Sequence, residues 1–189
     1  MKIKNFQFDR HFLASIEPER KFVLDSIEKD ETDKMVSKIL CGLNHGPPIL
    51  VLINSDGGSL MDGLKLCDCF KISPSPVIGL VIGRAVSAAL IALQGCSHRL
   101  ATPHARLLVH EPFDEPEIKI SRDTDIASVG RFLKGKKEQI ALRSEMMTKL
   151  FSQIMKMPMA QTREFIKEER IIFPTEAKRL GLIDKVINL

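Results

Sequence analysis

"VIGLVIGRAVSAAL", residues 77–90, runs from a wholly apolar stretch into a group of small residues around one serine, Ser87. An uninterrupted apolar run of this kind is typical of a strand that is covered on both faces of a sheet. The residues from Ser87 onward favour a helix that ends at Gly95. The stretch therefore predicts a buried strand that passes directly into a helix, with Ser87 at the corner.

The same alternation of strand and helix occurs earlier in the chain. Strands and helices are expected in turn over residues 21–27, 30–44, 49–54, 60–72, 77–83 and 87–95. Asp30 or Thr32 is expected to cap the first of these helices. An order of this kind predicts an α/β fold with a mostly parallel sheet and helices on its faces.

The pattern changes after two further short strands, at residues 98–103 and 105–111. Apolar residues then recur at spacings of three and four along one long amphipathic helix, at Ile126, Val129, Leu133, Ile140, Met147, Leu150 and Ile154. Gly130 and Gly135 weaken this helix locally, and Pro158 ends it. A helix of this length in a small domain is expected to project or to pack on another subunit. Two short helices and a closing strand follow.

Composition limits the class of protein. The 189 residues are expected to form one domain, because 44% are hydrophobic and 28% are charged, which is ordinary for a globular protein. The small net charge of +4 and the absence of tyrosine and tryptophan argue against nucleic-acid binding. No apolar run approaches the roughly 18 residues of a membrane span, and the N-terminus lacks the apolar segment of a secretory signal. A cytoplasmic protein is expected.

The four cysteines are expected to be reduced and to act as small buried hydrophobic residues, at Cys41, Cys67, Cys69 and Cys96. They form no C-x-x-C pair, and no H-x-x-x-H helix is present, so no metal site is expected. Neither phosphate-binding glycine motif occurs, and no organic cofactor is expected.

Ser87 has two interpretations from its surroundings. Serine is a favoured helix cap, and an isolated serine at this corner is more often a cap than a nucleophile. The corner would also leave the N–H of Ala88 free to stabilise an oxyanion. His110, at the end of the second short strand, supplies the base that a nucleophilic serine needs. The remaining histidines are expected to be exposed side chains, at His11, His45, His98 and His104.

Four segments in order carry a resemblance to a known family. They are "LINSDGGSLMDGL" (52–64), "GRAVSAAL" (83–90), "ARLLVHEP" (105–112) and "PTEAKRLGLIDKV" (174–186). Together they resemble the proteolytic subunit of the Clp protease, a self-compartmentalising serine peptidase, over nearly the whole chain. The resemblance implies a ClpP/crotonase-like α/β fold of repeated β-β-α superhelical units with a mostly parallel sheet and a projecting handle helix.

The resemblance also assigns roles to residues. It implies that Ser87 is the nucleophile, that His110 is the general base, and that the backbone N–H groups of Gly58 and Ala88 form the oxyanion hole. Residues of about 118–157 correspond to the handle region, which in the family interleaves two facing heptameric rings. Residues 1–20 form an N-terminal segment of a single peptidase domain over residues 1–189.

The acid of the triad departs from the family. Counting back from the last segment places Glu169 where the family has an aspartate, with Glu168 as its neighbour and Asp114 and Asp123 as more distant candidates. Glutamate serves this role in other serine hydrolases.

Three further positions differ from the family pattern. Asp56 replaces a proline and Arg84 replaces a glutamine. The acidic "FDEPEIKIS" (113–121) replaces a glycine-rich strand that, in the family, is thought to pair with substrate and with the opposite ring.

Two functions of different classes follow. The first is a serine endopeptidase that hydrolyses unfolded polypeptides inside a homo-oligomeric chamber, a heptamer or double heptamer, with an AAA+ unfoldase as partner by analogy. The second is a degenerate ring subunit with a structural or regulatory role, which the change of the acid and residues 113–121 favour. A third, weaker hypothesis is binding of an acyl-coenzyme A enolate, as in the crotonases, although those enzymes rely on carboxylates rather than on a serine and a histidine.

Overall fold

The computed structural model describes residues 8–43, 45–114 and 116–188. Residues 1–7 of the expected N-terminal segment therefore lie outside the described residues. The chain divides into two compact units. The first unit runs up to Val109 and resumes at Arg170, and the second unit comprises His110–Glu169.

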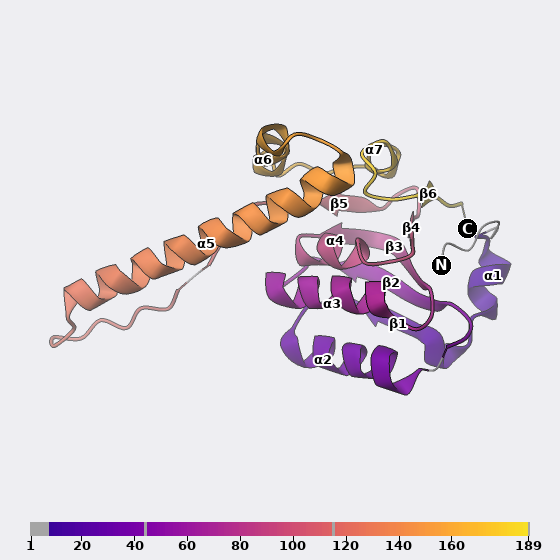
Figure 1. Cartoon of the computed structure of the whole chain (residues 1–189), viewed down its shortest axis with the longest axis horizontal. Helices are drawn as coiled ribbons and strands as arrows, with labels where there is room; N and C mark the ends of the chain where they lie inside the picture. The colour runs from indigo at the N-terminus through magenta and orange to yellow at the C-terminus, as the bar shows by residue number, and fades with distance from the viewer. Residues whose placement is uncertain (1–7, 44, 115, 189) are drawn as a thin grey trace. The chain divides into compact units, whose positions relative to one another are not determined.

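The first unit contains the sheet. Its six strands are β1 (Lys21–Leu24), β2 (Ile49–Ser55), β3 (Val77–Val86), β4 (His98–Ala101), β5 (Arg106–Leu108) and β6 (Lys185–Val186). The strand order is β1-β2-β3-β4-β6, β5 pairs with the end of β3, and every one of these strand pairings is parallel (Figure 1). The α/β fold with a mostly parallel sheet is confirmed.

Helices cover both faces of this sheet. The first unit contains α1 (Arg10–Ser15), a 3-10 turn (Pro18–Arg20), α2 (Lys29–Ser37), a π-helical turn (Lys38–Gly42), α3 (Leu60–Ile72), α4 (Ala88–Leu93) and α7 (Pro174–Arg179). Leu13 of α1 and Ile16, which follows α1 directly, pack with Leu50, Ile78 and Leu80 on one face. Figure 1 shows α2, α3 and α4 side by side over the sheet.

β3 approaches α4 closely on the face that α1 does not cover. A Cβ on Gly79 would lie 2.6 Å from Leu93 Cδ1 and 2.7 Å from Cys96 Sγ. Because both faces of β3 are buried in this way, its sequence contains no alternating polar positions up to Val81.

The start of α2 differs from the prediction. The helix begins at Lys29 with Glu28 at the N-cap position, and Glu28 makes no side-chain capping bond. The prediction that Asp30 or Thr32 caps this helix is therefore wrong. Asp30 instead lies in the first turn, where a carboxylate complements the positive end of the helix dipole. Thr32 is buried inside the helix.

The second unit is built around α5 (Ile126–Met155), followed by α6 (Met159–Lys167). The Asp125 carboxylate caps α5 by accepting hydrogen bonds from the N–H groups of Ala127 and Ser128. Lys156 ends the helix in the left-handed conformation, with a φ of 52°. The long amphipathic helix predicted from the apolar spacing between Ile126 and Ile154 is confirmed.

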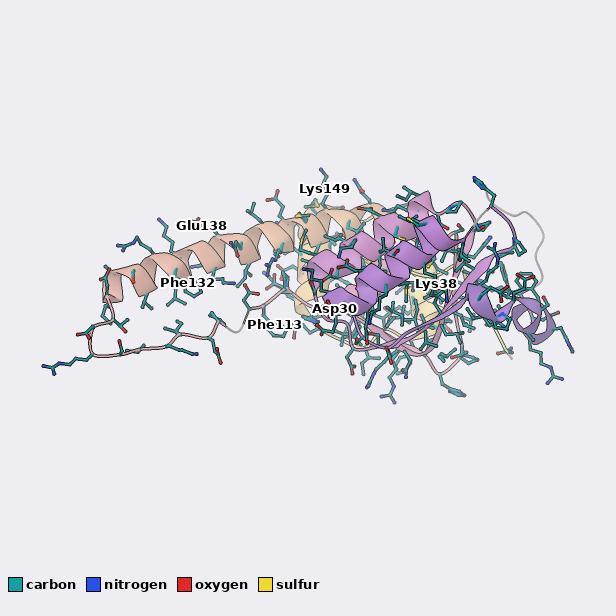
Figure 2. All side chains as sticks on the ribbon, turned by 90° about the horizontal axis from the view of Figure 1, so that it is seen from below. Asp30, Lys38, Phe113, Phe132, Glu138 and Lys149 are labelled. Atoms are coloured by element: carbon teal, nitrogen blue, oxygen red, sulfur yellow. The ribbon has the colours of Figure 1, made fainter. Side chains whose placement is uncertain are left out.

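Most of the apolar residues of α5 are exposed. Within α5 the buried residues are Met147, Thr148 and Phe151, all in its last third. Ile126 is 70% exposed and Leu142 is 63% exposed. Figure 2 shows Phe132 and Glu138 pointing to different sides of the helix. The apolar spacing of the sequence therefore predicted the helix correctly. Within the described residues, side chains of α5 are buried only near its C-terminal end.

Arg99 joins β4 to the C-terminal segment of the first unit. Its guanidinium donates to the Asp184 carboxylate at 2.6 Å, to the Gly181 carbonyl at 2.6 Å and to Gln94 Oε1 at 2.7 Å. Burial raises the pKa of Asp184, but the hydrogen bonds and the charge of Arg99 outweigh burial and hold this pKa below its usual value. The ion pair therefore stabilises the fold wherever Asp184 is ionised.

We expect Arg99→Met to lower the free energy of unfolding by about 1–3 kcal/mol, because three polar partners lose a charged donor. The loss should be complete above about pH 4, the unfolded-state pKa of an aspartate, and should shrink as the pH falls through the lower folded-state pKa. Urea denaturation at pH 7 and pH 3 measures both effects. Arg179→Met is the matched control, since Arg179 is 74% exposed and makes one 3.4 Å ion pair. Equal losses in the two variants would contradict this account.

Candidate active site

Ser87 lies at the corner between β3 and α4, as the sequence predicts. Its N–H donates to the Leu108 carbonyl at 2.9 Å, and its own carbonyl accepts from the N–H of Leu90 at 3.0 Å. Its backbone has φ 55° and ψ −122°, a conformation that residues other than glycine rarely adopt. The backbone thus takes the N-cap position of α4.

The Ser87 side chain does not act as a cap. A capping serine accepts a hydrogen bond from a backbone N–H two or three residues later, and Ser87 Oγ makes no such bond. Nor does this oxygen bond any other described residue. The sequence left two interpretations of Ser87 open, a helix cap and a nucleophile. The structure argues against the cap, because the Ser87 hydroxyl makes no capping hydrogen bond.

The small residues beside Ser87 serve packing. Ala88 and Ala89 are completely buried. A Cβ on Gly63 of α3 would lie 2.8 Å from the Ala88 carbonyl oxygen and 2.9 Å from the Ala88 Cβ, so α3 crosses α4 closely at this point. The small side chains around Ser87 are therefore explained in part by the contact between two helices.

Gly57 and Gly58 form a turn against the Ser87 corner. Gly57 has φ 99°, and a Cβ there would lie 2.7 Å from the Val86 carbonyl oxygen and 2.9 Å from Ser87 Cβ. Gly58 has φ 139°, and a Cβ there would collide with the Ile27 carbonyl oxygen. Each position therefore requires glycine, because its φ is positive and because the neighbouring atoms leave no space for a Cβ.

Backbone hydrogen bonds fix the same turn. Ile27 N–H donates to the Gly57 carbonyl at 2.9 Å, and Ser59 N–H donates to the Ile27 carbonyl at 3.0 Å. The N–H groups of Gly58 and Ala88 donate to no acceptor in the described part of the chain. These two unused donors belong to the turn and to the corner, which Gly57 brings into close contact.

Asp56 and Arg84 form an ion pair beside this turn. The distance between Asp56 Oδ2 and Arg84 Nη2 is 2.9 Å. Their side chains are 70% and 53% exposed, so the pair contributes at most about 1 kcal/mol to stability. Both positions depart from the pattern of the family that the sequence resembles. Their opposite charges are the one sequence feature that agrees with this ion pair.

His110 and Glu169 lie in the second unit, as its first and last residues. His110 Nδ1 is 2.7 Å from the carbonyl oxygen of Glu111, and the ring centroids of His110 and Phe113 are 5.7 Å apart. Glu169 follows α6 with φ 47°, and its N–H donates to the Ile166 carbonyl at 3.3 Å. The Glu169 carboxylate is exposed and makes no hydrogen bond or ion pair with a described residue.

The other candidate acids have different surroundings. Asp114 forms ion pairs with Lys136 at 3.3 Å and Arg143 at 3.0 Å, both from α5. The hydrogen bond from Lys136, opposed by burial and reinforced by Arg143, holds the pKa of Asp114 below its usual value. Asp123 is exposed. Asp114 is thus already paired with two cationic side chains of α5.

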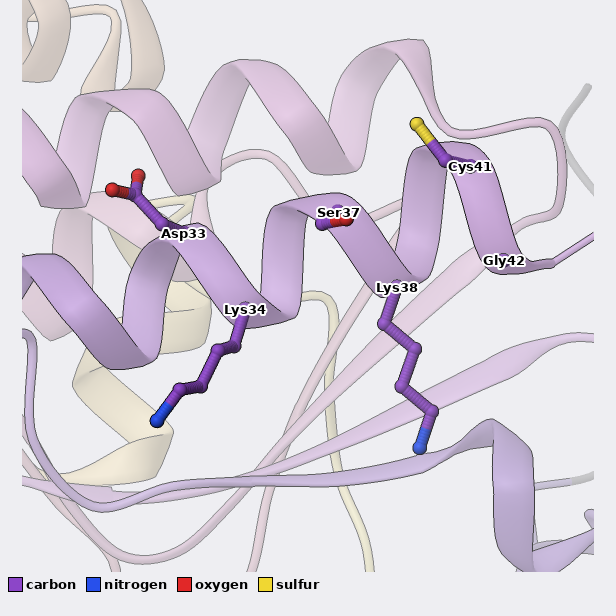
Figure 3. Close-up of a pocket in the computed structure, with 6 residues that line it drawn as sticks. All are labelled: Asp33, Lys34, Ser37, Lys38, Cys41 and Gly42. Carbon is purple, nitrogen blue, oxygen red and sulfur yellow. The ribbon is translucent and has the colours of Figure 1, made fainter.

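Three of the four cysteines are buried, as the sequence predicts, and Cys41 is the exception. Burial raises the pKa of the Cys69 thiol to about 11, so it stays protonated at neutral pH. Cys41 is exposed on the π-helical turn after α2, in a shallow hollow with Lys34 and Lys38 (Figure 3). The prediction that Cys41 is buried is wrong, because it lies on the outer side of that turn.

Neither a metal-binding cluster nor a membrane-spanning helix occurs in the described part of the chain. No group of three or more histidine, cysteine, aspartate or glutamate side chains is arranged to hold a metal ion in the described part of the chain. Among its helices, none combines the length and apolar character that crossing a membrane requires.

Comparison with known proteins identifies the family. Residues 13–189 match the family described as Clp protease. The ATP-dependent Clp protease proteolytic subunit 1 of Protochlamydia amoebophila is 31% identical over 185 residues, which are 95% of this chain and 85% of the relative. Proteolytic subunit 2 of Streptomyces coelicolor is 28% identical over 166 residues, covering 86% and 72%.

A solved structure supports the fold. A mutant of ClpP1 from Listeria monocytogenes superposes with a TM-score of 0.75 at 18% identity, covering 90% of this chain and 92% of the other. At this identity the likeness concerns the fold alone. Because the family match covers almost the whole chain and a relative reaches 31% identity, the chain belongs to the Clp protease family, whose members are serine peptidases.

Proposed function

We propose that this chain is an active serine endopeptidase subunit and that Ser87 is its nucleophile. The observation that carries the proposal is the strained, positive-φ backbone of Ser87 at a corner where its hydroxyl has no capping role. Backbone strain of about 1–3 kcal/mol persists where the surrounding structure enforces it, and such positions cluster at active sites. The unused N–H groups of Gly58 and Ala88 support the same role.

The proposed reaction proceeds in two halves. Ser87 Oγ attacks the scissile carbonyl carbon while His110 accepts the hydroxyl proton, and the N–H groups of Gly58 and Ala88 stabilise the oxyanion. The tetrahedral intermediate expels the amine, which receives the proton from His110. Water then attacks the acyl-enzyme with His110 again as base, and the acid product leaves with Ser87 restored.

The family resemblance assigns the acid of this triad to Glu169. Its carboxylate is exposed and has no partner among the described residues, so it is free to respond to a charged histidine. In this role the negative charge of Glu169 would stabilise the imidazolium. We propose that the whole chain acts as one peptidase domain in this reaction.

An oligomeric chamber agrees with the exposed residues of the second unit. Large apolar side chains are exposed along α5 and the segment before it, at Phe113, Ile120, Ile126, Phe132, Leu133, Leu142 and Met146. Soluble monomers rarely expose so many apolar residues on one element, and such patches mark protein contacts. We propose that they are buried in a homo-oligomer, a heptamer or double heptamer, that admits unfolded polypeptides from an AAA+ unfoldase in the cytoplasm.

A degenerate ring subunit is the second candidate. The observation that favours it is the Glu169 carboxylate, which forms no interaction with a described residue. A purely structural copy, however, would not need to retain the strained Ser87 corner.

Labelling with a fluorophosphonate probe tests the first proposal. We expect assembled wild-type protein to form one adduct per chain, on Ser87, and Ser87→Ala to form none, because the probe requires an activated nucleophile. Ser37→Ala is the control, since Ser37 is exposed on α2 and should label as the wild type does. Peptide mapping by mass spectrometry locates the adduct. Absence of a Ser87 adduct in assembled wild-type protein favours the degenerate subunit.

The strain at Ser87 predicts an unusual order of stability. We expect Ser87→Gly to be more stable than Ser87→Ala by about 1 kcal/mol, because glycine adopts a positive φ without steric cost. At Ser144, inside α5, the order should reverse, because glycine in a helix is less favourable than alanine by about 1 kcal/mol. Chemical denaturation of the four variants measures both differences. The same order at the two sites would remove the evidence for strain.

A further inference from the structure

The Glu111 carbonyl fixes the protonation of His110. Its oxygen lies 2.7 Å from His110 Nδ1, and a carbonyl oxygen accepts hydrogen bonds but cannot donate them. Nδ1 must therefore carry the proton in the neutral ring, which leaves Nε2 as the acceptor. This is the tautomer in which Nε2 acts as the general base toward a serine hydroxyl.

A carboxylate usually selects this tautomer in serine peptidases. We propose that in this chain the main-chain carbonyl of Glu111 orients His110 instead, so that Glu111 is a positioning residue and the Glu169 carboxylate is not needed to set the tautomer. The proposal rests on the proposed function and concerns how its base is held. The contacts that support the proposal all lie within the second unit.

The residues after His110 favour a fixed carbonyl direction. Glu111 precedes Pro112, and the residue before a proline is restricted to extended backbone conformations. Pro112 itself has a fixed φ. The Phe113 ring lies beside the imidazole, with an interplanar angle of 36°. The segment from Glu111 to Phe113 therefore limits both the rotation of the carbonyl and the rotation of the ring.

Asp114 anchors this segment to α5. Its carboxylate is only 21% exposed, and its two partners, Lys136 and Arg143, have side chains that are 32% and 30% exposed. Two partly buried cations on one rigid helix hold a carboxylate more firmly than a single exposed pair does. The position of the Glu111 carbonyl is thus tied to α5 and not to a free loop.

A carbonyl partner has a defined chemical consequence. The proton of Ser87 moves to Nε2, the Nδ1 proton stays on its nitrogen, and the imidazolium is held by a neutral acceptor. A carboxylate also attracts the imidazolium through its opposite charge, which a neutral carbonyl lacks, so a carbonyl stabilises the imidazolium less than a carboxylate would. Acylation is therefore expected to be slow.

Nitrogen NMR of the histidine rings tests the tautomer directly. Full-length assembled protein with 15N-labelled histidine is sedimented and measured by solid-state NMR at pH 8, and His110→Ala identifies the His110 signals. We expect a protonated Nδ1 and an unprotonated Nε2, both in wild type and in Glu169→Gln. A protonated Nε2 in wild type, or a change of tautomer in Glu169→Gln, overturns the proposal.

Labelling rates test the anchor. We expect the rate constant for fluorophosphonate labelling to fall about tenfold in Asp114→Ala, because small displacements of a catalytic group cost large rate factors. The double variant Lys136→Gln with Arg143→Gln should reproduce the fall while leaving Asp114 in place. Lys137→Gln is the control, since Lys137 is exposed on the same turn of α5. An unchanged rate constant in Asp114→Ala would contradict the anchoring role of Asp114.

The two experiments separate this proposal from the proposed function. If wild-type protein labels on Ser87 and the NMR spectrum shows a protonated Nε2, the peptidase function holds and the carbonyl proposal fails. If wild type shows the protonated Nδ1 but no labelling of Ser87, the peptidase function fails and the contact with Glu111 remains as structure alone.

Discussion

The absence of a side chain at Gly57 is the constraint on which the candidate active site depends. The backbone of the turn after β2 lies against the Val86 carbonyl and the Cβ of Ser87, at distances that no Cβ could tolerate. On its other side the turn is hydrogen bonded to Ile27. Gly63 brings α3 onto Ala88 in the same way. The corner that contains Ser87 is therefore enclosed by backbone on several sides.

This enclosure explains why a serine persists in a backbone conformation suited to glycine. The bonds that Ser87 makes through its N–H and its carbonyl fix the corner from β5 and from α4. The free-energy cost of this conformation of Ser87 is offset by the packing of the neighbouring helices and strands. The hydroxyl itself takes no part in holding the corner together.

Much of the first unit could be predicted from the sequence because its signals are strong. Apolar runs without polar interruption appear at 49–53 and 77–83, and both belong to central strands of the parallel sheet. The position of Ser87 followed from the junction of such a run with a helix. Its backbone conformation did not, because a positive φ at a serine has no sequence signature and is imposed by the packing around it.

The partner of His110 shows the limit of sequence reasoning more clearly. Counting along the chain can propose a side chain, such as Glu169, but every residue carries a main-chain carbonyl. The Glu111 carbonyl is therefore invisible in the sequence, and Pro112 is the only letter that indicates a restricted backbone there. The ion pair of Asp56 and Arg84 is an intermediate case. The two charges are visible in the sequence, but that the side chains lie close together is known only from the fold.

The contrast between Cys41 and the other three cysteines has a practical consequence. Thiolates react with alkylating reagents, and burial raises the pKa of the thiols of Cys67, Cys69 and Cys96. Cys41 alone of the four is exposed, on a turn that contributes nothing to the Ser87 corner. The native sequence thus provides one chemically addressable position per chain, at which a fluorophore or a mass tag would count subunits in an assembly without any engineered cysteine.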